Sequence, residues 1–146
     1  MEHISIHAEI ELKVEFFDVD SMQIVWHGNY VKYMEQARCA LLDKIGYNYN
    51  EMAKGGFAWP VVDIHLKYVR PLVFNQRFRI RATLVDWENR IKIEYLLSDP
   101  VSGQKITTGH SIQMAVEVAS GESLFATPRI ALDHIAAYLA KLEAKS

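Results

Sequence analysis

Residues 16–38 read FFDVDSMQIVWHGNYVKYMEQAR, and the rest of the chain is organised around this stretch. Two acids, Asp18 and Asp20, lie in a short turn, and a long helical pattern begins just after His27. A helix N-terminus offers unpaired backbone N–H groups that can bind an oxyanion, while a nearby carboxylate can act as a base or a nucleophile. We therefore expect the active site here, with the remaining chain building a pocket around it.

Apolar side chains recur at regular spacing on both sides of this turn. Before it, residues 8–16 alternate between apolar and polar side chains, which predicts a strand with one solvent-facing side that ends at a turn over 18–21. After it, apolar residues recur at helical spacing, which predicts a helix buried over much of its circumference. These positions are Tyr30, Tyr33, Met34, Ala37, Leu41 and Ile45. Gly46 stands where a left-handed helix cap is expected.

The rest of the chain is mostly strand. A short helix is expected over 50–54, strands over 62–68, 78–84, 91–97 and 106–118, and a last helix from Pro128 to 140. Four consecutive strands joined by short turns favour an antiparallel sheet. We predict an α+β fold, with a curved antiparallel sheet wrapped around one long central helix and a C-terminal helix. Such a sheet is longer than one helix can cover, so we expect a homo-oligomer, a dimer or a dimer of dimers.

Composition excludes several classes of protein. The 146 residues suit one domain spanning 1–146, and a net charge of −2 provides no basic field for nucleic acid. The apolar runs are far shorter than the roughly 20 residues that cross a bilayer, and residues 1–11 do not resemble a signal peptide. The single cysteine, Cys39, is expected to be a buried reduced thiol in a cytoplasmic protein.

Several residues of the opening stretch form a spaced pattern: F-x-D-x-D, then V-x-H-x-x-Y, then E-x-A-R. The matching positions are Phe16, Asp18, Asp20, Val25, His27, Tyr30, Glu35, Ala37 and Arg38. Together with the segment YVRPL at 68–72 and the element order from 12 to 139, the pattern resembles the hot-dog-fold acyl-CoA thioesterases of the 4-hydroxybenzoyl-CoA thioesterase type.

The resemblance implies hydrolysis of an acyl or aryl thioester of coenzyme A or acyl carrier protein, with no metal or further cofactor. It assigns the catalytic carboxylate to Asp20, as nucleophile or general base, and the backbone N–H that polarises the thioester carbonyl to His27. It places Glu35 toward the acyl pocket. The chain departs from the family at Gln23, where glycine is usual, and a glutamine there would narrow the acyl tunnel or supply a hydrogen-bond donor.

Each of these residues also has a purely structural interpretation. Asp20 and Asp18 are residue types that commonly form turns or cap helices. His27 would then be a polar residue at a helix start, and Glu35 the ion-pair partner of Arg38 three positions later. A metal site at His27 is disfavoured, because the fourth residue after it is Val31 and not a ligand.

Two further residues are candidates for contact with substrate. Trp26 either lines an acyl or aryl pocket or belongs to the core. Arg90 is the best candidate for the phosphates of coenzyme A, because arginine forks suit phosphate. The nearby arginines of the 77–81 strand are better explained as a solvated sheet face.

Two other functions stay open at this stage. One is a hot-dog dehydratase or hydratase, which would need a catalytic histidine such as His65 or His110. The other is binding of acyl thioesters or carrier proteins without turnover, which Gln23 at the usual glycine position keeps open.

Overall fold

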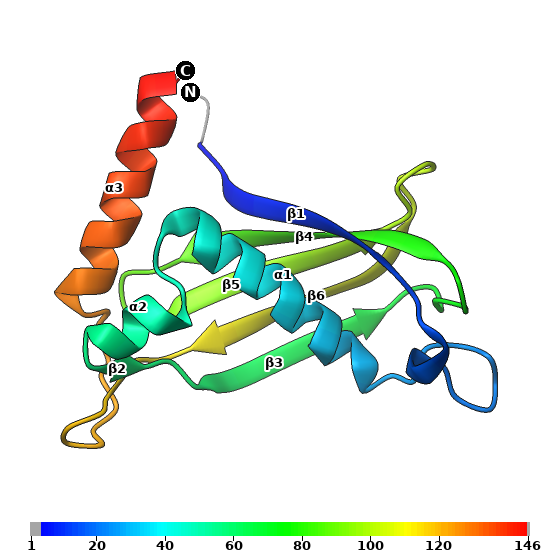
Figure 1. The fold of residues 1–146 in the computed structure, drawn as a ribbon, viewed down its shortest axis with the longest axis horizontal. Helices are drawn as coiled ribbons and strands as arrows, with labels where there is room; N and C mark the ends of the chain where they lie inside the picture. The colour runs from blue at the N-terminus through cyan, green and yellow to red at the C-terminus, as the bar shows by residue number, and fades with distance from the viewer. Residues whose placement is uncertain (1–3, 146) are drawn as a thin grey trace.

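The computed structural model describes residues 4–145, and its main feature is a five-stranded antiparallel sheet in the order β1-β4-β5-β6-β3 (Figure 1). The strands are β1 (Ile6–Lys13), β3 (Val61–Tyr68), β4 (Arg77–Asp86), β5 (Ile91–Ser98) and β6 (Lys105–Gln113). Short turns join β4 to β5 and β5 to β6, as the alternating patterns predicted. In this order β1 and β3 form the two edges.

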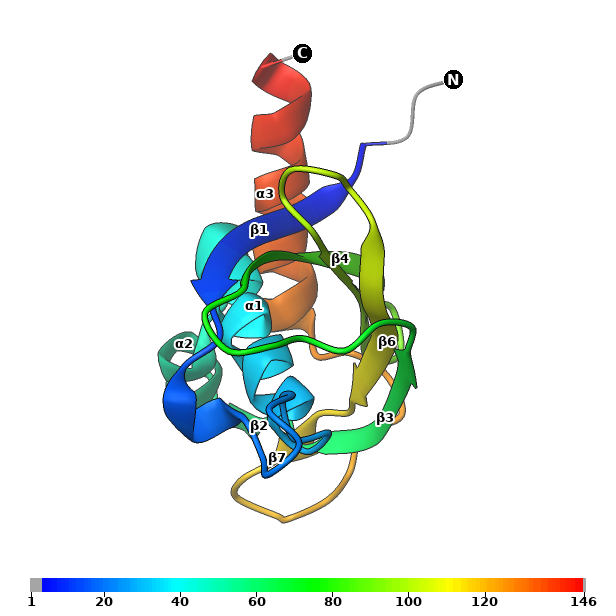
Figure 2. The same cartoon turned by 90° about the vertical axis from the view of Figure 1, so that its right-hand side faces the viewer.

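Helix α1 (Asn29–Ile45) lies across one face of this sheet, and Figure 2 shows the sheet curving around it. Its buried residues are Tyr30, Tyr33, Met34, Ala37, Arg38, Leu41, Leu42 and Ile45, which include every apolar position predicted from the helical spacing. Gly46 closes the helix at φ 86°, a left-handed conformation that glycine adopts without strain. The predicted hot-dog fold, an antiparallel sheet around one long helix, is confirmed.

The smaller elements gather at the C-terminal end of α1. They are α2 (Tyr49–Lys54), the paired short strands β2 (Phe57–Ala58) and β7 (Val116–Glu117), and α3 (Arg129–Lys145). The buried residues of α3 are Ala131 and Ile135, and its His134 ring lies 5.2 Å from the ring of Tyr47. None of the helices in the described range is long and apolar enough to span a membrane. The cytoplasmic location stays a prediction.

Two predicted strands end earlier than expected. The strand predicted over 8–16 stops at Lys13, because the chain turns into a short 3-10 helix, η1 (Phe16–Asp18), and Phe16 is 73% exposed. The strand predicted over 106–118 is divided, since β6 ends at Gln113 and the next residues pair with β2 instead. Cys39 was expected to be buried, but it lies on the exposed side of α1.

The helix-facing side of β6 is polar. Residues directly opposite on antiparallel strands share a face, and the buried Tyr95 and Leu97 stand opposite Gly109 and Thr107. The side chains toward α1 are therefore those of Thr107, Ser111 and Gln113, all buried. Polar groups inside a core need partners, and this face supplies the buried cluster described below.

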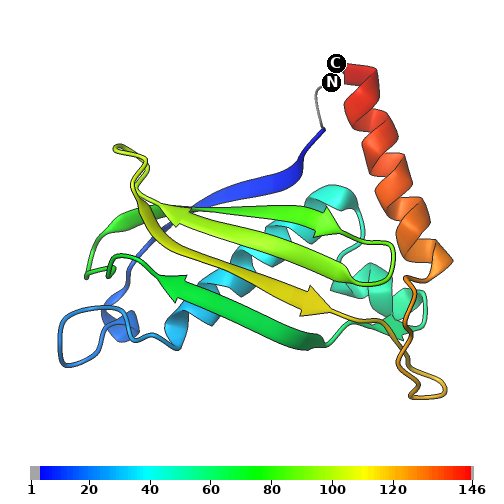
Figure 3. The ribbon, with the colours of Figure 1, turned by 180° about the vertical axis from the view of Figure 1, so that it is seen from behind.

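The other face of the sheet carries no helix, as Figure 3 shows from behind. Glu9 of β1 lies between Arg79 and Arg81 of β4, with oxygen–nitrogen distances of 3.8 and 3.5 Å. The structure thus supports the interpretation of these arginines as a solvated, charge-balanced face.

Candidate active site

The loop after η1 holds Asp20 in a tight turn. The N–H of Asp20 donates to the carbonyl of Ile24 at 2.9 Å, and the N–H of Gln23 donates to the carbonyl of Asp20 at 3.0 Å. The Asp20 side chain accepts from the N–H of Met22 at 2.8 Å. The turn requires a left-handed residue at Gln23, whose φ is 68°. Gln23 therefore adopts the unusual backbone conformation that the family glycine would take without strain.

Asp18 has a different environment from Asp20. It is buried, its carboxylate lies 2.8 Å from the Lys32 ammonium, and it accepts from the N–H of Glu15. Burial by itself would raise the pKa of Asp18, but the bonds from Lys32 and Glu15 outweigh burial and lower this pKa. Its carbonyl accepts from the Asn29 amide at 2.8 Å, which ties η1 to the start of α1. These contacts support the structural interpretation of Asp18 as a turn-forming residue.

Asp20 and His27 line the same cavity, which has a volume of about 330 Å³. Its other lining residues are Met22, Ile24, Val25, Tyr30, Tyr68, Val69, Arg70 and Pro71. The walls are mainly apolar, whereas Asp20 and Arg70 supply charge of opposite sign. A mostly apolar cavity with a few polar groups is the usual form of a small-molecule site.

His27 lies at the entrance to α1. Its carbonyl accepts from the Tyr68 hydroxyl at 2.8 Å, and no acceptor for its N–H occurs within residues 4–145. Trp26, half exposed, packs its ring against the His27 ring at 5.1 Å and covers Gly28, where a Cβ would collide with the indole. The N–H of His27 is thus a donor at a helix N-terminus, beside a cavity that also holds a carboxylate.

All four predicted substrate-binding residues are absent from the lining of this cavity. Gln23 holds the Asp20 turn through its backbone N–H, and its side chain is exposed. Trp26 covers Gly28 instead of lining the cavity wall. The side chain of Glu35 is 60% exposed and stands 3.6 Å from Arg38, as its structural interpretation predicted. Arg90 bonds Asp86 at 3.3 Å in the β4–β5 turn, at the opposite end of the sheet from the Asp20 loop (Figure 1).

Tyr30, Tyr68 and Arg70 join the cavity without having been predicted as site residues. The available signal was the V-x-H-x-x-Y pattern for Tyr30 and the YVRPL segment at 68–72 for the other two, both noted for their resemblance alone. Tyr68 ends β3, and its hydroxyl reaches the loop before α1, so the edge strand and the helix start together define the wall.

An antiparallel sheet curved around one long helix defines the class of hot-dog proteins, and this chain also has a carboxylate close to the helix start. The chain belongs to the Thioesterase-like superfamily, whose family model matches residues 14–138.

Named relatives agree with this assignment. Bacillus subtilis YneP, which carries the provisional name of an acyl-CoA thioesterase, is 36% identical over 85 residues, covering 58% of this chain and 61% of YneP. The Synechocystis protein sll0410, provisionally named an esterase, is 27% identical over 134 residues, covering 87% of this chain and 77% of that protein. The match therefore spans less than two thirds of YneP.

Solved structures match the fold over most of the chain. DHNA-CoA thioesterase from Staphylococcus aureus superposes with a TM-score of 0.79 at 21% identity, covering 94% of this chain and 91% of that one. The protein SAV2348 from Staphylococcus aureus, solved in complex with CoA, superposes with a TM-score of 0.80 at 15% identity. The match covers 97% of this chain and 86% of SAV2348.

Proposed function

We propose that the protein hydrolyses acyl or aryl thioesters of coenzyme A, with Asp20 as the catalytic carboxylate. The observation that carries the proposal is the shared cavity, in which Asp20 stands beside His27 at the start of α1. Membership of the superfamily and the name of YneP support this chemistry, and the CoA complex of SAV2348 supports the choice of thiol.

The geometry suits either of two routes. As a general base, Asp20 takes a proton from water, whose oxygen bonds to the carbonyl carbon; the carbon–sulfur bond then breaks, and the thiolate leaves and is protonated. As a nucleophile, Asp20 attacks the carbonyl carbon, the carbon–sulfur bond breaks and the thiolate leaves and is protonated; water then hydrolyses the resulting mixed anhydride and frees the acid and Asp20. In both routes the carbonyl oxygen gains negative charge, which the His27 N–H and the helix N-terminus stabilise.

The test is thiol release from a panel of short, long and aromatic acyl-CoA thioesters, including 4-hydroxybenzoyl-CoA for the finer family resemblance. Asp20→Asn should lower kcat/KM by about 10²–10⁴-fold, because it removes the base while keeping the shape. Asp43→Asn, the same change at an exposed position of α1, should leave kcat/KM unchanged. A wild type that cleaves no member of the panel would refute the proposal. Acyl carrier protein thioesters form a second arm, with faster turnover expected for coenzyme A.

The structure offers no support for a hydratase. His65 and His110 stack 5.4 Å apart on paired positions of β3 and β6, and neither belongs to the Asp20 cavity. Their position beside Glu94 and Arg81 is on the helix-free face of the sheet. Loss of enoyl-CoA absorbance without thiol release would nevertheless favour hydration over hydrolysis.

The proposal includes a homodimer formed through β3. Within residues 4–145 no strand pairs with the outer edge of β3, and seven of its eight residues are exposed. Val61, Val62, Ile64 and Tyr68 are apolar residues among them. An unpaired edge with apolar side chains favours pairing with a second copy. Light scattering should give a dimer for wild type and for Val101→Lys, and a monomer for Ile64→Lys; a monomeric wild type would contradict the dimer.

A further inference from the structure

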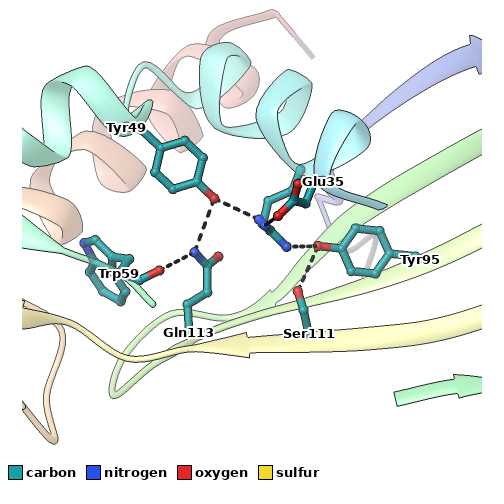
Figure 4. Close-up of polar contacts among 7 residues, drawn as sticks. Glu35, Tyr49, Trp59, Tyr95, Ser111 and Gln113 are labelled. Carbon is teal, nitrogen blue, oxygen red and sulfur yellow. Dashed lines mark hydrogen bonds and ion pairs between the residues drawn. The ribbon is translucent and has the colours of Figure 1, made fainter. Parts of the chain in front are cut away.

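The middle of α1 contains a buried cation. Arg38 is 4% exposed. Figure 4 shows the polar side chains that gather around it, among them Tyr49, Tyr95 and Gln113. Its Nε donates to the Tyr49 hydroxyl at 2.8 Å, and a terminal nitrogen donates to the Tyr95 hydroxyl at 3.5 Å. The nearest carboxylate, Glu35, stands 3.6 Å away on a largely exposed side chain. The buried charge of Arg38 is therefore paired with a carboxylate whose own side chain is largely in solvent.

Several polar groups in the cluster around Arg38 have no hydrogen-bond partner among the described residues. A guanidinium has five N–H donors, and two of them are used by Tyr49 and Tyr95. Gln113 donates to the Trp59 carbonyl at 2.7 Å and to the Tyr49 hydroxyl at 3.4 Å, which leaves the Tyr49 hydrogen free to donate. The Gln113 amide oxygen is buried and has no hydrogen-bond partner among the described residues. The remaining guanidinium N–H groups and the Tyr49 hydroxyl hydrogen are donors suited to an anion, whereas the Gln113 oxygen is suited to a donor.

An apolar cavity of about 450 Å³ adjoins the cluster. Its lining residues are Tyr49, Met52, Ala53, Phe57, Ala58, Trp59, Pro60 and Val116. Tyr49 and Trp59 belong to both the cavity and the cluster, so they form the boundary between them. Tyr49 is 40% exposed and begins α2, so it stands where the cavity, the cluster and the protein surface meet.

The cluster comes close to the proposed catalytic site in the proposed dimer. An antiparallel pairing of β3 with its copy, centred on the strand, puts Tyr68 of the second copy opposite Val61. Val61 pairs with Gln113 on β6. Two strand spacings then separate Gln113 from the second copy's Tyr68, about 10 Å. An acyl group bound at that copy's Asp20 would extend toward the cluster.

We propose that the Arg38–Tyr49–Gln113 cluster binds a carboxylate at the far end of the acyl group, which makes thioesters of dicarboxylic acids the preferred substrates. The proposal rests on the thioesterase function and the dimer. Arg38 supplies the charge and donors that suit a carboxylate, the Tyr49 hydroxyl adds a third donor, and Gln113 positions that hydroxyl. The apolar cavity holds the methylene chain.

The experiment compares thioesters of equal chain length that end in a carboxylate, a hydroxyl or a methyl group. Adipoyl-CoA, 6-hydroxyhexanoyl-CoA and hexanoyl-CoA form one set, and suberoyl-CoA and octanoyl-CoA extend it. Wild type should favour the carboxylate over the methyl group by about ten- to a hundredfold in kcat/KM. Preference for the hydroxyl would overturn the proposal, because the Gln113 oxygen and not the Arg38 charge would then govern recognition.

Two variants separate recognition from folding. Tyr49→Phe keeps the exposed ring and should lower kcat/KM for carboxylated substrates alone. Gln113→Glu adds a carboxylate to the cluster from within the chain, so it should abolish the preference for a carboxylated substrate. Gln36→Glu adds the same charge at an exposed position of α1 and should leave the preference unchanged. If Tyr49→Phe and Gln113→Glu lower turnover of all three substrates equally, the cluster is structural and the proposal fails.

Calorimetry of suberate and octanoate binding to wild type and Tyr49→Phe gives a readout that needs no catalysis. Suberate should bind wild type about tenfold or more tightly than octanoate, with the difference lost in Tyr49→Phe. Suberate binding without hydrolysis of any thioester would refute the thioesterase function and support the carboxylate site. Hydrolysis without a preference for carboxylated substrates and without suberate binding would support the thioesterase function and refute the carboxylate site.

Discussion

Replacing Gln23 by glycine should stabilise the protein, which is unusual for a glycine substitution. Gln23 has a φ of 68°, a region that costs an ordinary L-residue about 1–2 kcal/mol. Its side chain is exposed, and its turn bond uses the backbone N–H, so glycine keeps every contact. Glycine also gains freedom in the unfolded chain, which costs about 0.4–1 kcal/mol. The net stabilisation is therefore about 0.5–1 kcal/mol.

The matched control is Gln36→Gly, the same substitution at an exposed position in the middle of α1. Glycine there should destabilise by about 0.5–1 kcal/mol, because a helix interior disfavours it. Urea unfolding measures both free energies, and a domain of this size should shift its Tm by about 2–4 °C per kcal/mol. The two variants should therefore move in opposite directions. Equal destabilisation by both would show that Gln23 is not left-handed in solution and would refute the reasoning.

Three further predictions concern the site and its support. The folded-state pKa of Asp18 is lowered, so its carboxylate stabilises the fold at neutral pH, and this stabilisation disappears as the pH falls below about 4. The difference in unfolding free energy between wild type and Asp18→Asn, measured in urea, should accordingly be large at neutral pH and small at acidic pH. Gly28→Ala should displace the Trp26 ring and lower thioester hydrolysis about tenfold, whereas a double variant with Trp26→Ala should recover it. Tyr30→Phe should cost about 1–2 kcal/mol in urea unfolding, because the buried N–H of Leu72 loses its acceptor.

The fold was largely predictable because its determinants are local. The helical spacing of apolar residues marked the buried side of α1, and strict alternation marked β3, β4 and β5. Strand ends were less predictable. The apolar Phe16 continued the alternation, yet the Asp18 carboxylate and the backbone N–H of Glu15 draw the chain into η1. A hydrogen bond between a side chain and the backbone therefore sets the end of β1, and the alternation of apolar and polar residues does not predict such a bond.

The candidate site was predictable in its position and only partly in its members. Asp20 and His27 share a cavity because the turn and the helix start are close in sequence. Arg90 was assigned from charge alone, and the β4–β5 pairing carries it to the far end of the sheet. Tyr68 was not assigned to the site, because its contact with His27 joins residues 41 positions apart.

The amino-acid sequence by itself determined the long buried helix, the antiparallel strands and the carboxylate just before a helix N-terminus, because each is encoded by neighbouring residues. Only the tertiary structure decided that Asp18 is buried against Lys32 while Asp20 faces a cavity, and that Gln23 is left-handed. It also gathered Arg38, Tyr49 and Gln113 from α1, α2 and β6 into one hydrogen-bonded cluster. Such differences depend on packing between elements distant in the chain, which sets the burial and the hydrogen-bond partners of each side chain.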